Sequence, residues 1–77
     1  MARTVLDNVA DTTSTDVTIH KDPTAVWLTA GSANIEMDGN VVEVLDIAEP
    51  TRIWGLLPGE VVQIVASGAG TTVKVAP

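Results

Sequence analysis

Hydrophobic and polar residues alternate in three stretches of this 77-residue chain. Residues 16–20 read Asp-Val-Thr-Ile-His, which places Val17 and Ile19 on one face of an extended strand. Residues 34–38 and 71–76 alternate in the same way. A period of two residues is typical of a strand that buries one face, so the pattern predicts β structure from residue 16 onward.

Four more strands are expected, at residues 25–29, 41–47, 51–56 and 61–66. Asp38-Gly39 suits a type I′ hairpin turn, and Pro58-Gly59 suits a type II turn. No gap between strands is long enough for the crossover helix that parallel strands need. The sequence therefore predicts an all-β fold, a compact antiparallel β-sandwich or small barrel of about seven short strands.

Residues 1–15 differ from the rest, because Thr, Ser and Asp dominate there. The only sizeable apolar side chains in this segment are Val5, Leu6 and Val9. We expect an extended N-terminal arm or a first edge strand here, ahead of a β-sandwich domain at residues 16–77. A frayed terminus is the alternative.

Several of the predicted strands carry apolar residues on both faces. Trp27 lies on the face opposite Val26 and Leu28, and valines fall on both faces of residues 41–47 and 61–66. Only one face of each strand meets the core of a two-layer sandwich, so a lone chain cannot bury both. We expect other protein to cover the surplus, with tryptophan as an anchor. A closed barrel with bulges that change the facing of residues is the alternative.

Composition also favours association. A chain of this length buries only about 60% of its surface, and there is no cysteine to add a disulfide. Apolar residues nevertheless make up 45% of the chain and charged residues only 18%, which favours a homo-oligomer or docking onto a larger assembly. The expected interface residues come from the arm and from the surroundings of the two tryptophans: Val5, Leu6, Val9, Trp27, Trp54, Leu56 and Leu57.

The net charge of −6 argues against nucleic acid and anionic membrane surfaces as partners. The four basic residues are scattered and form no phosphate-binding stripe: Arg3, Lys21, Arg52 and Lys74. Asp7 and Asp11 interrupt the N-terminal segment, so we expect no signal peptide. No apolar run approaches the ~18 residues that span a bilayer. The chain is expected to be made in a cytoplasm.

No catalytic signature is visible. His20 is the only histidine, and the nearby hydroxyls of Thr18 and Thr24 show no nucleophile pattern. Residues 38–40 resemble a fragment of a calcium loop, but a hairpin turn explains them more simply. Residues 68–72 lack the lysine and the helix of a phosphate loop. We therefore expect no enzyme, no metal and no cofactor.

The stretch of residues 16–76 resembles the small β-sandwich virion proteins of tailed bacteriophages. The segments that carry the resemblance are residues 16–19, 26–28, 31–39, 57–60 and 70–75. It implies a non-enzymatic capsid decoration (cement) protein, often a homotrimer, on the outer capsid surface at junctions between major capsid proteins. The arm at residues 1–15 is the expected contact with the shell or with a neighbouring subunit.

Two other functions fit the same sequence. A phage tail or fibre component is the first, since it too is a structural virion protein. A small carbohydrate-binding module is the second, in which an exposed Trp27 or Trp54 stacks on a sugar ring. The presence of only two aromatic residues argues against this module, because such sites usually array several.

Overall fold

The computed structural model describes residues 3–20, 24–48, 51–53 and 56–76. Within these ranges the chain forms eight β-strands and no helix, so the described part holds no helix that could cross a membrane. The strands are β1 (Arg3–Val9), β2 (Ser14–Thr18), β3 (Thr24–Ala30), β4 (Ala33–Met37), β5 (Asn40–Val44), β6 (Thr51–Ile53), β7 (Val61–Ala66) and β8 (Thr71–Ala76). The prediction of an all-β fold is confirmed.

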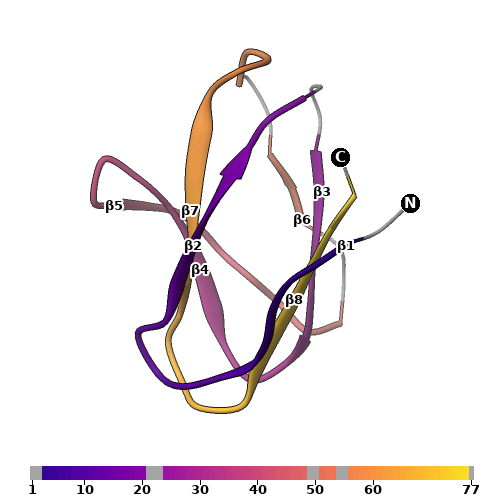
Figure 1. Cartoon of the computed structure of the whole chain (residues 1–77), viewed down its shortest axis with the longest axis vertical. Coiled ribbons are helices and arrows are strands. Elements are labelled where there is room, and N and C mark those ends of the chain that lie inside the picture. Colours follow the sequence, from indigo (N-terminus) through magenta and orange to yellow (C-terminus); the bar gives the residue numbers. More distant parts are fainter. Residues whose placement is uncertain (1–2, 21–23, 49–50, 54–55, 77) are drawn as a thin grey trace.

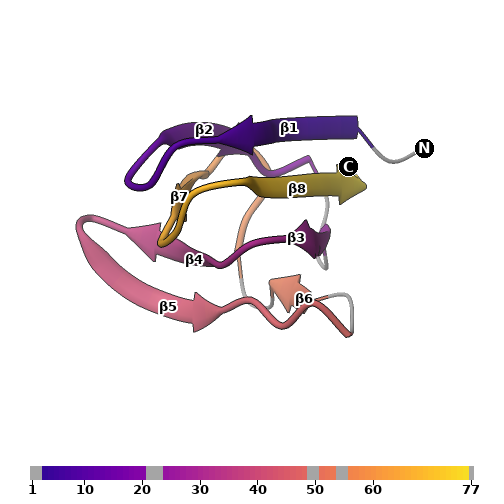
Figure 2. The same cartoon turned by 90° about the horizontal axis from the view of Figure 1, so that it is seen from below.

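The strands form two four-stranded antiparallel sheets (Figures 1 and 2). Sheet A has the order β1-β8-β3-β6, and sheet B has the order β2-β7-β4-β5. β1 and β2 are the edge strands on one side of the molecule, and β5 and β6 are those on the other side. The two sheets do not close into a barrel, so the structure is the sandwich and not the barrel alternative.

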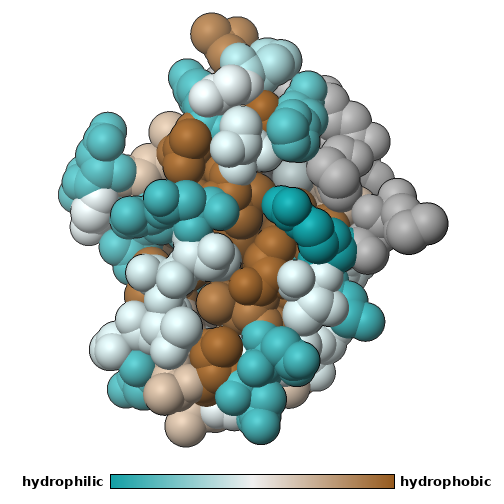
Figure 3. Space-filling view, viewed as in Figure 1, coloured by the Kyte–Doolittle hydropathy of each residue, from teal (hydrophilic) through white to brown (hydrophobic). Residues whose placement is uncertain are grey.

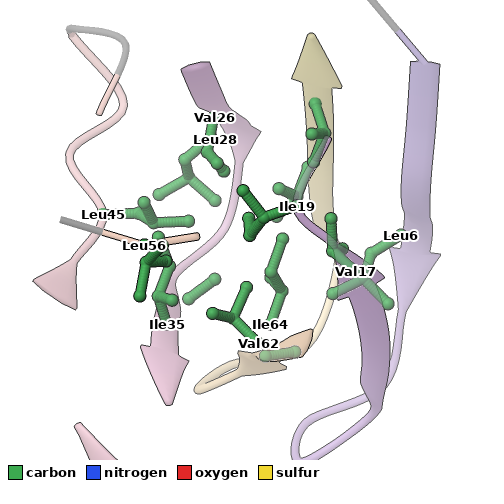
Figure 4. Close-up of a cluster of buried hydrophobic side chains, with 14 residues drawn as sticks. Leu6, Val17, Ile19, Val26, Leu28, Ile35, Leu45, Leu56, Val62 and Ile64 are labelled. Atoms are coloured by element: carbon green, nitrogen blue, oxygen red, sulfur yellow. The ribbon is translucent and has the colours of Figure 1, made fainter. Parts of the chain in front are cut away.

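The core lies between the two sheets, where inward side chains of both interdigitate (Figure 4). The predicted inward residues Val17, Ile19, Val26 and Leu28 are all at most 4% exposed. Ile35, Val62, Ile64, Val73 and Val75 complete the largest part of the cluster. Burying each such side chain stabilises the fold by about 1.5–3 kcal/mol, which makes this cluster the main source of stability.

The two predicted turns are present. Asp38 and Gly39 both have positive φ, 51° and 79°, as a type I′ hairpin between β4 and β5 requires. Gly59 has a φ of 94°, and the Glu60 amide donates to the Leu57 carbonyl at 3.1 Å. Both features define the type II turn that Pro58-Gly59 predicts.

The N-terminal segment pairs with the body of the sandwich. β1 lies antiparallel to β8 at the edge of sheet A, with Leu6 opposite Val73. Leu6 is 4% exposed and belongs to the core. Of the two expectations for this segment, an arm or a first edge strand, the structure has the edge strand over residues 3–9. β2 then begins at Ser14, two residues before the expected start of the domain.

One end of the sandwich is closed by a buried threonine. The Thr71 hydroxyl accepts a hydrogen bond from the Ser32 amide at 3.2 Å, and it lies 2.7 Å from the Gly68 carbonyl to which it donates. Gly31 has a φ of 76° and sits directly against Thr71. These contacts tie the β3–β4 turn to the β7–β8 turn across the two sheets.

Candidate protein-interaction surface

The strand β5 exposes every one of its five residues. Three of them are valines, with Val41 53%, Val42 48% and Val44 70% exposed, and Ile47 just beyond the strand is 59% exposed. A soluble protein seldom presents so many apolar side chains from one short segment without a partner. We call these four residues the β5 patch.

The exposure of β5 follows from its place in the fold. It is the edge strand of sheet B and pairs only with β4. The neighbouring edge strand of sheet A, β6, has three residues and pairs with the first three residues of β3. β5 projects away from β6 (Figures 1 and 2), so neither of its faces is covered.

The free edge of β5 also offers main-chain hydrogen-bonding groups. The Leu45 amide donates to the Ala33 carbonyl at 3.0 Å, so Leu45 turns its main-chain groups toward β4. Successive residues of a strand turn theirs in opposite directions. The amide and carbonyl of Val44 therefore point to the free edge, where an added strand can pair with them.

Register places the side chains of β5 on defined faces. Val44 lies opposite Asn34 on the outer face of sheet B, because the flanking residues Ala33 and Ile35 are buried. Glu43 lies opposite Ile35 and shares its inward direction, yet it is exposed. β5 thus presents an apolar side chain outward and a carboxylate inward at successive positions.

A groove of about 400 Å³ continues from the end of β5. Its apolar wall is formed by Leu28, Ala33, Val44, Leu45 and Ile47. Ser32, Ser67 and the carboxylate-bearing Asp46 supply its polar groups. One Asp46 oxygen, Oδ1, accepts a hydrogen bond from the Ala48 amide at 2.9 Å, which holds the residue at the turn after β5.

Charge is unevenly divided between the two sheets. The strands of sheet B carry Asp16, Glu36 and Glu43 and no lysine or arginine. Asp38 and Asp46 flank β5 in the adjacent turns. The basic residues within strands all belong to sheet A: Arg3 in β1, Arg52 in β6 and Lys74 in β8. The β5 patch therefore lies in an acidic part of the molecule.

The two tryptophans differ in what the structure describes. Trp27 lies on the outer face of sheet A, opposite Lys74 in register, while Val26 and Leu28 face the core. This is the facing that the sequence predicts, and the indole is half-buried. Trp54 lies outside the described residues. Trp27 and the β5 patch belong to different sheets, so they form two separate surfaces.

The other predicted interface residues divide between core and surface. Leu6 and Leu56 are 4% and 8% exposed and belong to the core cluster, so they are already covered by this chain. Val5 and Val9 are half-buried against the same cluster, on the edge strand beside β2. Figure 3 looks onto this edge and shows an apolar band between hydrophilic residues. Leu57, at the tip of the β6–β7 connection, is 68% exposed.

The interface candidates named from the sequence leave out the β5 patch. The near-continuous run of apolar residues at 41–47 was the available signal, since it places valines on both faces of one strand. The expectation that one face of residues 41–47 meets the core holds at a single position, because all five residues of β5 are exposed. Leu45 alone returns to the core, at 6% exposed.

The described residues show no arrangement typical of a metal site. Groups of three or more histidine, aspartate or glutamate side chains placed to hold an ion do not occur within the described ranges. His20 is exposed just after β2. The chemistry that the described surface offers is main-chain pairing, apolar contact and negative charge.

Comparison with protein-family models, with curated proteins and with solved structures finds no match for this chain.

Proposed function

We propose that this chain is a non-enzymatic structural virion protein, a capsid decoration protein that binds the outer capsid surface and stabilises joints between major capsid proteins. The proposal takes the role from the resemblance of residues 16–76 to small phage virion modules. It takes its physical support from surfaces that fit contact with other protein.

The observation that carries the proposal is the β5 patch. Among the described residues, fourteen buried apolar side chains from both sheets already fill the core, yet three valines and an isoleucine remain exposed on one edge. In a protein that acts as a monomer, such an exposed apolar edge has no binding role and promotes aggregation. A chain that is covered by its partner uses the same residues for binding.

A decoration protein needs many copies and complementary surfaces, and it needs no reaction. Binding across a joint raises the free energy needed to separate the two sides. A homotrimer multiplies weak single contacts, because its second and third contacts form at high effective concentration. Trp27 on the outer face of sheet A is the anchor that we assign to the contact between subunits.

Virus particles purified from the cells that make this chain test the proposal. We expect the chain to copurify with intact particles through a density gradient, in a fixed ratio to the major capsid protein, by quantitative mass spectrometry. A chain that stays in the soluble fraction, or whose ratio to the shell varies between preparations, contradicts the proposal. A fixed ratio to isolated tails instead of heads supports the tail component.

The partial exposure of Trp27 favours one second candidate, a carbohydrate-binding module. An indole on an outward sheet face can stack on a sugar ring. Tryptophan emission of the chain, titrated with a panel of glycans, distinguishes the two: a saturable shift supports the module, and unchanged emission removes it.

A further inference from the structure

We propose that the free edge of β5 binds an extended strand of a different protein, and that this strand alternates apolar and basic side chains. This inference extends the proposed function, because it names the chemistry of the protein partner. It rests on the proposed function in one respect, which is that the partner is another protein.

The main chain of β5 supplies the first part of the argument. The Leu45 amide donates to the Ala33 carbonyl, so the main-chain groups of Leu45 point toward β4. The main-chain groups of successive residues in a strand point to opposite edges, so the amide and carbonyl of Val44 point away from β4. An extended peptide adds to such an edge by forming main-chain hydrogen bonds. The partner is therefore a strand and not a helix, since a helix has no free main-chain groups along its length.

The side chains of β5 predict that apolar and basic residues alternate along the partner strand. Val44 faces outward and Glu43 faces inward, and both are exposed. A strand that pairs with β5 also alternates between these two faces. Its apolar residues then lie beside Val44 and its cations lie beside Glu43, which gives each side chain a favourable neighbour.

The groove at the end of β5 fits a long basic side chain. Leu28, Leu45 and Ile47 line its apolar part, and Asp46 supplies a carboxylate. Lysine and arginine pack their methylene stems on apolar surface and keep the charged head near polar groups. Because Val44 belongs both to the groove and to the free edge, one strand can occupy the two together.

Charge argues against a second copy of this chain as the occupant. Pairing β5 with the β5 of another molecule brings Asp38, Glu43 and Asp46 of both copies together along one short edge. No strand of sheet B holds a lysine or arginine to offset this repulsion. Like charges at a contact disfavour it, whereas a basic partner turns the same carboxylates into attractions.

An amide-shift titration of the ¹⁵N-labelled full chain tests the proposal. The probe is the acetylated and amidated peptide Lys-Val-Lys-Val-Lys-Val-Lys, added at physiological salt. We expect saturable shifts confined to β5, to the turn after it and to the adjacent β4. The same peptide with its central valine N-methylated should bind at least about tenfold more weakly, because it loses a main-chain donor. A peptide with glutamate in place of each lysine should not bind.

Two chain variants separate local charge from total charge. Glu43→Lys should weaken binding of the lysine peptide about tenfold, since an attraction becomes a repulsion. Asp16→Lys makes the same charge change on β2, at the opposite edge of the same sheet, and should leave affinity within about twofold.

Several results overturn the proposal. They are the absence of peptide binding, shifts centred on Trp27 and Lys74, equal losses in the two variants, and equal binding of the N-methylated peptide. Shifts of β5 that depend on the concentration of the chain alone assign the edge to a second copy instead. These results do not involve virus particles, so they are distinguishable from a failure of the proposed function.

Discussion

Two independent constraints favour glycine over any other residue at position 31. Its φ of 76° lies in the region that side chains disfavour, and a Cβ there would lie 2.7 Å from the Thr71 Cα. Gly39 has nearly the same φ, 79°, but no atom within 4 Å of an added Cβ. The two glycines therefore separate the cost of the dihedral angle from the cost of the contact.

We predict that Gly31→Ala lowers the free energy of unfolding by more than Gly39→Ala does. The dihedral angle costs each variant about 1–2 kcal/mol, and the contact with Thr71 costs Gly31→Ala a further 1–3 kcal/mol or so. Urea denaturation monitored by circular dichroism measures both values. Equal losses in the two variants would mean that the β3–β4 turn moves freely away from Thr71.

Substitution of Trp27 distinguishes two roles for its side chain, an anchor in the contact between subunits and a part of the core. We predict that Trp27→Ala lowers the mass of the oligomer in solution but costs the fold well under the ~3–5 kcal/mol that a fully buried tryptophan costs. Sedimentation velocity gives the mass and urea denaturation gives the stability. Thr29→Ala, on the same outer face, is the control. Wholesale unfolding of Trp27→Ala contradicts the role in the contact between subunits.

At the scale of the strand, β5 and β7 show how the same residue type has two different roles. Val44 on β5 is 70% exposed, and Val62 on β7 is fully buried. We predict that Val44→Thr changes the free energy of unfolding by less than about 0.5 kcal/mol, whereas Val62→Thr lowers it by about 1–3 kcal/mol, because only the latter buries a hydroxyl. Urea denaturation checks both values.

The same pair of variants tests binding. Val44→Thr should weaken binding of the Lys-Val peptide in the amide-shift titration, since the peptide loses its apolar neighbour. Val62→Thr, compared at a temperature where it is folded, should bind as the unchanged chain does. A large loss of stability in Val44→Thr contradicts the exposed position of this residue.

Local patterns were sufficient to predict most strands and turns of this fold. Alternation identified the inward residues of β2, β3 and β8, because each of these strands has one face toward the core. Asp38-Gly39 and Pro58-Gly59 identified their turns, because positive φ at those positions favours those residues. These features depend on neighbours in sequence, so the sequence contains them.

The place of β1 and β5 in the sheets depends on distant residues, and the sequence left both open. Leu6 is buried because β1 pairs with β8, which follows more than sixty residues later. Residues 41–47 are apolar on both faces, and β5 is uncovered because it is the edge strand of sheet B, pairs only with β4 and lies apart from the short strand β6. The interface candidates therefore included Leu6, which is in the core, and omitted Val41, Val42 and Val44.

The whole molecule combines two different surfaces. Sheet A carries Trp27 together with the basic strand residues, and sheet B carries the β5 patch among carboxylates. Because the two surfaces lie on different sheets, contact between subunits through one leaves the other free for a partner. This division suits a decoration protein, which has to bind its own copies and a shell at the same time.

We predict that the isolated chain forms a trimer, with three times the 8.0 kDa mass of one chain. Sedimentation equilibrium over a range of concentrations measures this mass. Glu43→Lys should leave it unchanged, because the contact between subunits is assigned to sheet A. A strict monomer at the highest concentration contradicts the trimer, and a mass that depends on Glu43 moves the contact to β5.

Hydrogen exchange of residues 40–44, compared between the isolated chain and the chain in the capsid particle that the proposed function requires, examines whether other protein covers β5. In the isolated chain the Val44 amide should exchange quickly, since it has no partner within the sheet. In the particle we expect its exchange to slow by at least about tenfold, as it pairs with an added strand. Equal exchange in the two states would contradict the proposal, because β5 would then remain uncovered in the particle as well.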